Sequence, residues 1–192
     1  MNFTDDFIEL WAMRHGQTGW NVEGRLQGQS DTKLTKVGVE QTVDLGRSLK
    51  HEKIDVAYSG PLDRVKETCK IIQEQNDFGF PIRIDDRITE RSFGRCEGML
   101  ESKYKEMHPN RWNLNHTFLG EGVELPKDML KRTNEFLKDI QAEHKKKKIL
   151  LSTHVGTMRA IYYALNPDQI SSDGDMNGYQ APKNCSVERY FL

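Results

Sequence analysis

The sequence predicts an α/β fold, a three-layer α/β/α sandwich with a mostly parallel central sheet. Short apolar runs that suit buried strands alternate along the chain with longer segments whose apolar residues recur every three or four positions, as they do in helices. Three of the strand-like runs also end directly at polar or charged residues. Parallel strands bring such ends to one edge of a sheet, where the ligands of α/β proteins bind.

The first strand is expected at residues 7–13, an apolar run that stops at a loop containing glycine and polar residues. Thr35 follows as the expected N-cap of a helix that runs to about residue 50, because a threonine hydroxyl can accept a hydrogen bond from a free backbone N–H. The residues expected on the inner face of this helix are Val39, Val43 and Leu49.

The next strand is expected at residues 54–58, a short run with β-branched side chains that ends at Ser59. Pro61 stands where the first turn of a helix tolerates proline, and we expect a helix there. Its apolar positions are separated by four and three residues, the helical period. They are Val65, Cys69 and Ile72. Residues 81–84 then indicate an extended segment.

Residues 85–122 are polar and irregular, and a connection of this length is usually functional or carries short helices of its own. A helix is expected from Pro126, because one apolar stripe follows this residue. The stripe consists of Met129, Leu130, Thr133, Phe136, Leu137 and Ile140. Four lysines at residues 145–148 indicate a solvated helix end or turn.

The end of the chain repeats the same alternation. Residues 149–153 are an apolar run typical of a buried strand, and residues 186–192 are expected to form a last strand. A helix is expected between them. Its apolar positions are Met158, Ile161, Tyr162 and Leu165.

Composition limits the classes of function. The chain has 192 residues, enough for one domain with a buried core, and 30% of them are charged and 36% hydrophobic. Its formal net charge of −1 argues against binding to nucleic acid or to an anionic membrane surface. No apolar stretch reaches the ~18 residues of a membrane span. The acidic residues 1–6 are not expected to begin a signal peptide.

The three cysteines, Cys69, Cys96 and Cys185, are odd in number and far apart. They form no C-x-x-C pair, which argues against a zinc site built from thiolates and against disulfides. We therefore expect a reducing compartment, the cytoplasm, and no bound metal.

The residues at three strand ends predict a pocket for an anion. Arg14 and His15 follow the first strand, Arg64 lies shortly after the second, and His154 follows the strand at residues 149–153. A single histidine in such a turn more often packs than binds a ligand. Two arginines and two histidines that meet at one sheet edge are hard to reconcile with that alternative.

Five motifs, in this order, resemble those of the histidine phosphatase superfamily, also called the phosphoglycerate mutase-like family. They are Arg14-His15-Gly16 with Thr18 and Asn21, Ser59 to Arg64, Glu90 to Gly98, Gly120-Glu121, and Ser152-Thr153-His154. The resemblance covers nearly the whole chain. It implies the family's α/β fold, one histidine phosphatase domain over residues 1–192, and a substrate-covering insertion at about residues 95–125.

The resemblance also implies roles for individual residues. His15 would be the nucleophile that is transiently phosphorylated, and Glu90 the proton donor. Without the other motifs, Glu90 would suit a solvated loop or an ion pair with Arg91. The residues implied in phosphate binding are Arg14, Arg64, His154, Asn21, Gln17 and Thr18. Val155 stands where the family usually has glycine. No cofactor is implied, and the arginines supply the positive charge that a metal would otherwise provide.

Residues outside the motifs are given less specific roles. Lys103, Lys105 and Arg111 could reach a second anionic group of a substrate, although a solvated face is the expected place for them. Glu121 could help to order a lid over the site or to orient a catalytic histidine. The histidines expected at the surface are His51, His108, His116 and His144.

Three functions remain open: a phosphatase of small phosphomonoesters, a phosphoglycerate mutase, and a non-catalytic module that binds a phosphorylated ligand. The mutases of this family carry a longer insertion with a basic, aromatic clamp. The segment between Gly98 and Pro126 is short and has no cluster of arginines and prolines, which favours the phosphatase. The expected partner is a small phosphorylated metabolite. The sequence leaves open its identity and the oligomeric state, with a homodimer among the alternatives.

Overall fold

The computed structural model describes residues 7–192, so the acidic residues 1–6 and the interpretation given to them lie outside the described part of the chain. In the described part, five strands form one sheet in the order β3-β2-β4-β1-β5. They are β1 (Glu9–Arg14), β2 (Val56–Ser59), β3 (Ile82–Ile84), β4 (Lys148–Thr153) and β5 (Val187–Phe191). The first four run parallel, and β5 pairs antiparallel with β1 at the edge. The predicted mostly parallel sheet is confirmed.

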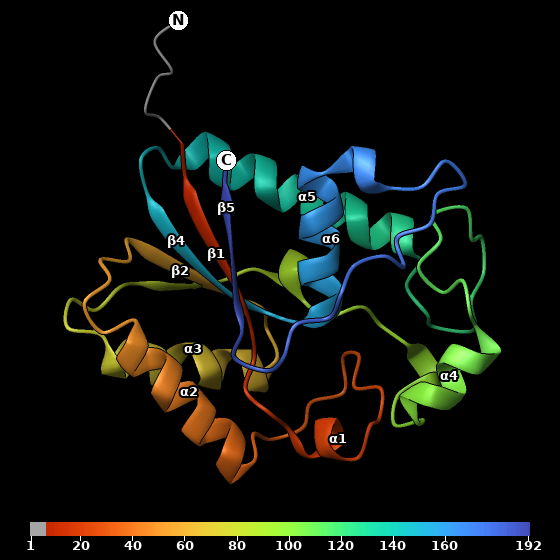
Figure 1. Cartoon of the computed structure of the whole chain (residues 1–192), viewed down its shortest axis with the longest axis horizontal. Helices are drawn as coiled ribbons and strands as arrows, with labels where there is room; N and C mark the ends of the chain where they lie inside the picture. Colours follow the sequence, from red (N-terminus) through yellow and green to blue (C-terminus); the bar gives the residue numbers. More distant parts are fainter. Residues whose placement is uncertain (1–6) are drawn as a thin grey trace, which may run out of the picture.

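Helices cover both faces of this sheet (Figure 1). The two on one face are α2 (Lys36–Ser48) and α3 (Asp63–Gln75), and the two on the other are α5 (Pro126–Glu143) and α6 (Val155–Leu165). Alternate residues of β1 divide between two cores. Leu10 and Ala12 belong to the core under α5 and α6, whereas Trp11 and Met13 belong to the core under α2 and α3. This division follows from the two-residue period of a strand and confirms the three-layer sandwich.

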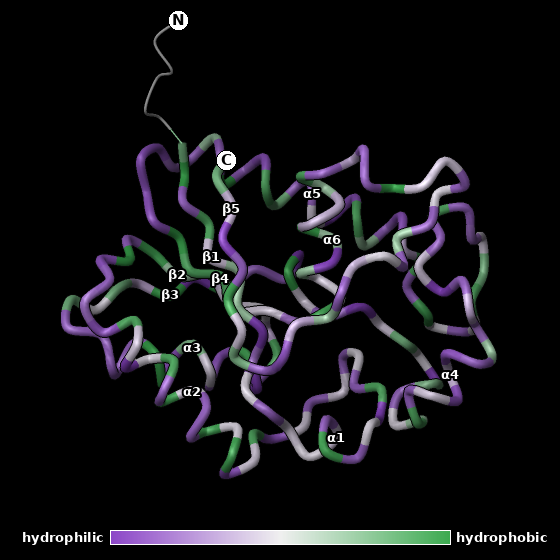
Figure 2. The backbone as a smooth tube through the Cα atoms, viewed as in Figure 1, coloured by the Kyte–Doolittle hydropathy of each residue, from purple (hydrophilic) through white to green (hydrophobic). Residues whose placement is uncertain are grey.

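Hydropathy along the chain reflects these layers. Figure 2 shows hydrophobic segments where β1 and β2 cross the middle of the molecule, and mixed colouring along the helices that flank them. Four consecutive residues of β1 and five of β4 are buried, as expected of parallel strands that are covered on both faces. No helix within residues 7–192 is long and apolar enough to cross a membrane.

The inner face of α2 differs from the prediction. Its buried residues are Gly38, Thr42 and Gly46, while Val39 and Val43 are only half-buried. The reason is a close approach: a Cβ atom on Gly38 would collide with the backbone oxygen of Gln17. The helix therefore turns its small residues inward and its valines to the side. Leu49, the C-cap residue, is buried as predicted. The predicted cap is confirmed, because the Thr35 hydroxyl accepts a hydrogen bond from Gly38 N at 2.9 Å.

The apolar faces of α3 and α5 are confirmed. Val65, Cys69 and Ile72 of α3 are buried, and so is the stripe of α5 apart from Leu130, which is partly buried. Pro61 precedes the helix, which begins at Asp63 after the N-cap residue Leu62, so it does not occupy the first turn.

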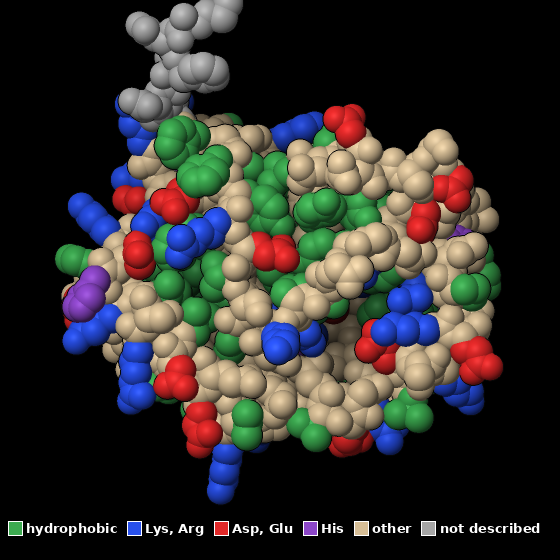
Figure 3. All heavy atoms as spheres, in the orientation of Figure 1, with side chains coloured by type: hydrophobic (Ala, Val, Ile, Leu, Met, Phe, Trp, Pro, Cys, Tyr) green, Lys and Arg blue, Asp and Glu red, His purple; other side chains and the backbone are tan. Residues whose placement is uncertain are grey.

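The long connection between β3 and α5 carries short helices, as expected. They are the 3-10 helices η1 (Asp86–Ile88) and η2 (Gly94–Cys96) and the α-helix α4 (Glu101–Met107). This connection packs on the loop after β1 through a small core of Leu26, Phe93 and Tyr104. The remaining short elements are α1 (Gly19–Val22) and η3 (Pro167–Gln169). On the face seen in Figure 3, acidic and basic side chains are interspersed, in keeping with the small net charge.

Candidate active site

The ends of β1 and β4 bring two histidines together. Arg14 pairs in register with Thr153, and His15 N donates a hydrogen bond to Thr153 O at 3.0 Å. His154 follows directly, so the ring centroids of His15 and His154 lie 5.3 Å apart. The third strand end, that of β2, leads through Ser59 into α3, whose second residue is Arg64. The predicted convergence of three strand ends is therefore present.

His15 presents an unprotonated ring nitrogen. Its Nδ1 lies 2.8 Å from Gly16 O, a backbone acceptor, so Nδ1 carries the proton and Nε2 keeps its lone pair. Burial, assisted by the charge of Arg64, holds the pKa of His15 well below its usual 6.5. The ring is therefore neutral at neutral pH, which a nitrogen nucleophile requires.

Two buried guanidinium groups flank this ring. Arg14 donates from Nη1 to Pro182 O at 2.7 Å, and Arg64 donates from Nη2 to Gly28 O at 2.6 Å and from Nη1 to Ser30 O at 2.8 Å. Among the residues described, neither Nε atom has a hydrogen-bond partner, although both are buried. Burial lowers the pKa of each group, but an arginine remains charged at neutral pH. Each therefore keeps an unused N–H donor on a full positive charge.

His154 is completely buried, and neither of its ring nitrogens has a partner in the described part of the chain. Burial and the charge of Arg64 hold the pKa of His154 well below its usual 6.5. The ring is therefore neutral at neutral pH. An anion bound beside it would favour the protonated ring, because an opposite charge raises the pKa of histidine.

Glu90 reaches the same cavity from the connection after β3. Its Oε1 accepts a hydrogen bond from Arg91 N at 2.8 Å, and its Oε2 accepts one from Gly156 N at 3.2 Å. Burial raises the pKa of Glu90 above its usual 4.5, although these N–H groups and Arg64 oppose the shift. A Cβ atom on Gly156 would collide with Glu90 Oε1, so the glycine leaves the room that this carboxyl group occupies.

Asn21 lines the cavity and is held through its amide oxygen. Its Oδ1 accepts hydrogen bonds from Thr18 N and Asn184 Nδ2, each at 3.1 Å. With the oxygen occupied on the protein side, Nδ2 is the donor left for a ligand.

Gln17 and Thr18 do not line this cavity, contrary to the expectation. Thr18 is fully buried, caps α1, and donates from Oγ1 to Gln27 Oε1 at 2.8 Å. The Gln17 Oε1 accepts a hydrogen bond from Thr35 Oγ1 at 2.9 Å, and its side chain borders a neighbouring hollow. Both residues hold the first loop in place from outside the cavity.

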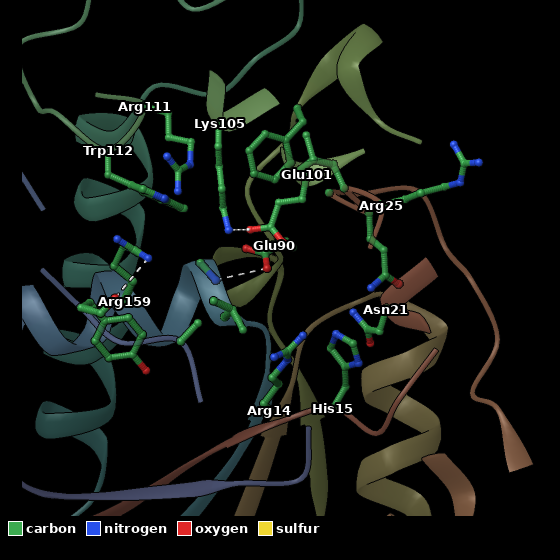
Figure 4. Close-up of a pocket in the computed structure, with 18 of the residues that line it drawn as sticks. Arg14, His15, Asn21, Arg25, Glu90, Glu101, Lys105, Arg111, Trp112 and Arg159 are labelled. Carbon is green, nitrogen blue, oxygen red and sulfur yellow. Dashed lines mark hydrogen bonds and ion pairs between the residues drawn. The ribbon is translucent and has the colours of Figure 1, made fainter. Parts of the chain in front are cut away.

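The cavity, of about 370 Å³, continues away from His15 to a second group of cations. Figure 4 shows Arg14, His15 and Asn21 at one end, Glu90 in the middle, and Lys105, Arg111 and Trp112 at the other end. Lys105 is exposed, as expected, although it borders the cavity and pairs there with Glu101 at 2.7 Å. Arg111 is half-buried and lines the cavity, so the solvated face expected for it is wrong. Lys103 is exposed, as expected.

Three residues in or beside the cavity were not recognised in the sequence. Asn184 donates to His15 O at 2.9 Å, and Arg159 and Trp112 line the far end of the cavity, where the guanidinium carbon lies 4.4 Å from the indole centroid. Asn184 lies in an irregular segment without periodicity. Arg159 lies on a helix whose apolar pattern drew attention to its other residues.

The remaining candidates lie apart from the cavity. Glu121 is exposed and pairs with Arg95 at 3.0 Å. His144 is not at the surface as expected, because its side chain is only 11% exposed and its Nε2 lies 2.9 Å from Tyr58 Oη. Within residues 7–192, no three His, Cys, Asp or Glu side chains group closely enough to hold a metal ion.

Comparison with known proteins agrees with this arrangement. The profile of the histidine phosphatase superfamily (branch 1) matches residues 10–189. A metal-independent phosphoserine phosphatase of Arabidopsis thaliana is 32% identical over 177 residues, a match that covers 89% of this chain and 73% of that protein. A 2,3-bisphosphoglycerate-dependent phosphoglycerate mutase of Nitrobacter hamburgensis is 30% identical over 173 residues, which cover 84% of each chain.

Among solved structures, Bacillus stearothermophilus YhfR aligns with a TM-score of 0.81 at 26% identity, over 95% of this chain and 90% of that one. The expected resemblance and fold are thus confirmed over nearly the whole length. The chain belongs to the histidine phosphatase superfamily, branch 1.

Proposed function

We propose that the chain is a metal-independent phosphatase that hydrolyses a small phosphomonoester through a phosphohistidine on His15. One observation carries this proposal. The buried Nε atoms of Arg14 and Arg64 and both ring nitrogens of His154 lack partners among the described residues. The charges of both arginines act on His15, whose ring packs against His154 and whose Nε2 is free. Buried polar groups are nearly always paired, so unpaired cationic donors indicate that an anionic ligand completes them.

The reaction would proceed in two halves. His15 Nε2 attacks phosphorus, the ester P–O bond breaks, and its electron pair leaves with the alcohol oxygen, which takes the proton of Glu90. The Glu90 carboxylate then accepts a proton from water, the water oxygen bonds to phosphorus, and the electron pair of the P–N bond returns to His15. Arg14, Arg64, Asn21 and His154 would hold the phosphoryl oxygens in both halves.

The two alternatives have less support. A mutase must retain a bisphosphorylated intermediate, and the segment between Gly98 and Pro126 is too short to carry the clamp expected for that task. A non-catalytic binding module does not require a proton donor, yet Glu90 lies in the cavity with a raised pKa. Because some relatives are named as mutases, the test below also measures mutase turnover.

The far end of the cavity favours a substrate with a second anionic group. Arg111 and Arg159 form no ion pair with any described carboxylate, and Arg159 Nε is buried without a partner. Burial, together with the charge of Arg111, lowers the pKa of Arg159 to about 10. A carboxylate bound between them would relieve this repulsion. We therefore propose a phosphorylated carboxylic acid as substrate, the class to which phosphoserine belongs.

The connection at about residues 95–125 would then be the substrate-covering insertion of a single histidine phosphatase domain. It supplies Glu101, Lys105, Arg111 and Trp112 to the cavity, and all four belong to the half that faces away from His15. A cytoplasmic location is part of the same proposal. It is supported by three cysteines that are free in the structure.

The reaction class is tested with p-nitrophenyl phosphate in excess EDTA. The wild-type protein is expected to release phosphate, His15→Ala is expected to be inactive, and acid quenching should destroy a phosphoryl adduct that survives in base. Activity lost in EDTA, or an acid-stable adduct, would contradict the proposal. Mutase turnover that exceeds phosphate release in the presence of 2,3-bisphosphoglycerate would favour the alternative.

The substrate class is tested with phosphoserine and phosphoethanolamine, which differ by one carboxylate. The wild-type protein should prefer phosphoserine in kcat/KM by about 10- to 100-fold, the range expected for a charge-assisted hydrogen bond. Arg111→Gln should remove this preference by lowering kcat/KM for phosphoserine alone, whereas Lys103→Gln on the exposed side of α4 should leave it unchanged. Equal wild-type turnover of both esters would refute a carboxylate subsite.

A further inference from the structure

Arg64 takes its orientation from a loop rather than from its own helix. Its guanidinium group donates to two backbone carbonyl oxygens of the loop at residues 28–31, those of Gly28 and Ser30. The Asp31 carboxylate is within 3.5 Å of Nη1 and accepts hydrogen bonds from the backbone N–H groups of Asp63 and Arg64. A displacement of this loop would therefore move the guanidinium group of Arg64, which lines the cavity.

A single carboxylate holds the loop in place. Glu97 Oε1 accepts a hydrogen bond from Gln29 N at 3.0 Å, and Glu97 Oε2 accepts two, from Ser30 N at 2.8 Å and from Ser30 Oγ at 2.5 Å. The loop is shaped to admit this side chain. Gly28 has a φ of 54°, and a Cβ atom there would collide with Glu97 Oε1.

The same carboxylate also binds the segment that carries the proton donor. Glu97 Oε1 accepts a fourth hydrogen bond, from Phe93 N at 3.1 Å, three residues after Glu90. The Gln29 side chain reinforces the link, since its Nε2 donates to Glu90 O at 3.2 Å. Glu97 forms no ion pair within residues 7–192, so its four acceptor positions serve N–H and O–H donors of these two segments.

We propose that Glu97 is a positioning residue that fixes Arg64 and Glu90 relative to each other. It does not contact the cavity, and it acts on the bound phosphate through the loop at residues 28–31. This role rests on the proposed function, because it takes phosphate as the ligand of Arg64. It is separate from the five assigned groups, His15, Arg14, Arg64, Glu90 and His154.

Glu97→Gln is the informative substitution because it keeps the shape of the side chain. Both carboxylate oxygens accept from backbone N–H donors, so the amide must turn its NH2 group toward one of them and leave that donor unpaired. The control is Glu121→Gln, which removes the same charge from an exposed side chain on the neighbouring segment.

The readout is the dissociation constant of inorganic phosphate, measured by calorimetry, with circular dichroism to verify folding. Glu97→Gln should raise this constant about tenfold in the wild-type background, in line with the loss of one hydrogen bond to a charged acceptor. In an Arg64→Lys background, Glu97→Gln should raise the dissociation constant less than about twofold. Lysine cannot bind the carbonyl oxygens of Gly28 and Ser30 at the same time, as arginine does. Glu121→Gln should leave the constant unchanged in both backgrounds.

An equal effect of Glu97→Gln in both backgrounds, or no effect in either, would overturn the positioning role. If Glu97→Gln does not fold, Ser30→Ala removes one of the four donors and is tested in the same two backgrounds with the same criteria. Failure of the wild-type protein to bind phosphate would overturn the proposed function, and this role with it. Unaltered binding by Glu97→Gln in a wild-type protein that binds phosphate would overturn this role alone.

Discussion

Opposing effects act on the pKa of Glu90. Burial raises its pKa, while Arg64 and the N–H groups of Arg91 and Gly156 stabilise the carboxylate. A carboxyl group in this balance can be protonated when substrate arrives and ionised when water must be activated. Both the position of Glu90 in the cavity and its raised pKa therefore suit the proposed proton donor.

Replacement of Glu90 by glutamine should affect esters according to their leaving groups. An alkoxide needs a proton as it leaves, and general acid catalysis contributes about 10²–10⁴-fold, so kcat/KM for an alkyl phosphate should fall by that order. Nitrophenolate leaves without this help, and p-nitrophenyl phosphate should be affected far less. Steady-state kinetics of both esters, with Glu121→Gln as control, test this assignment. Equal losses would indicate another proton donor.

The two buried histidines also predict how stability depends on pH. The pKa values of His15 and His154 are lowered well below 6.5 in the folded protein, whereas the unfolded chain titrates near 6.5. The unfolded state therefore binds more protons below pH 6.5, and the free energy of unfolding should fall as the pH falls below that value. The two groups together contribute a slope of up to about 2.7 kcal/mol per pH unit.

Urea unfolding between pH 5 and pH 8 measures this slope. His154→Gln removes one of the two groups, so the slope below pH 6.5 should drop by about half relative to the wild-type protein. A slope that His154→Gln leaves unaltered would mean that His154 titrates alike in the folded and unfolded states.

At the scale of an element, α2 shows why an apolar pattern does not always identify the buried face. Gly38 packs against the Gln17 backbone, and Gly46 packs against Gln75 of α3. Gly38→Ala should therefore lower the free energy of unfolding by about 1–3 kcal/mol, the usual cost of overpacking. Gly19→Ala is the matched control, since a Cβ atom there meets nothing within 4 Å. Chemical denaturation compares the two, and equal stability would show that the helix can shift outward.

Local signals predicted the elements well where one residue type fixes the backbone. Thr35 caps its helix as expected, and Arg14, Arg64 and His154 follow buried strands whose ends the parallel topology brings together. The burial of Gly38 could not be read from the sequence, because periodicity counts apolar side chains and a glycine carries none. The place of Lys105 and Arg111 at the cavity could not be decided from the sequence for a different reason: it depends on how a long connection folds over a distant sheet edge.

The whole molecule balances charge globally but not locally. Its formal net charge is −1, yet the described residues that line the cavity include six arginines or lysines and only two carboxylates. The six are Arg14, Arg25, Arg64, Lys105, Arg111 and Arg159. The rigid two-core sandwich holds these like charges together at a cost to stability, which a bound anion should relieve.

Inorganic phosphate is therefore expected to raise the melting temperature by mass action. At 100 times its dissociation constant it should add about 2.7 kcal/mol, which corresponds to about 5–10 °C for a chain of this size. Sodium chloride at equal ionic strength should have a much smaller effect, because the unpaired Nε–H groups of Arg14 and Arg64 require an oxygen acceptor. Thermal scans of the wild-type protein and Arg64→Gln test this, and an equal shift in both would place the phosphate away from Arg64.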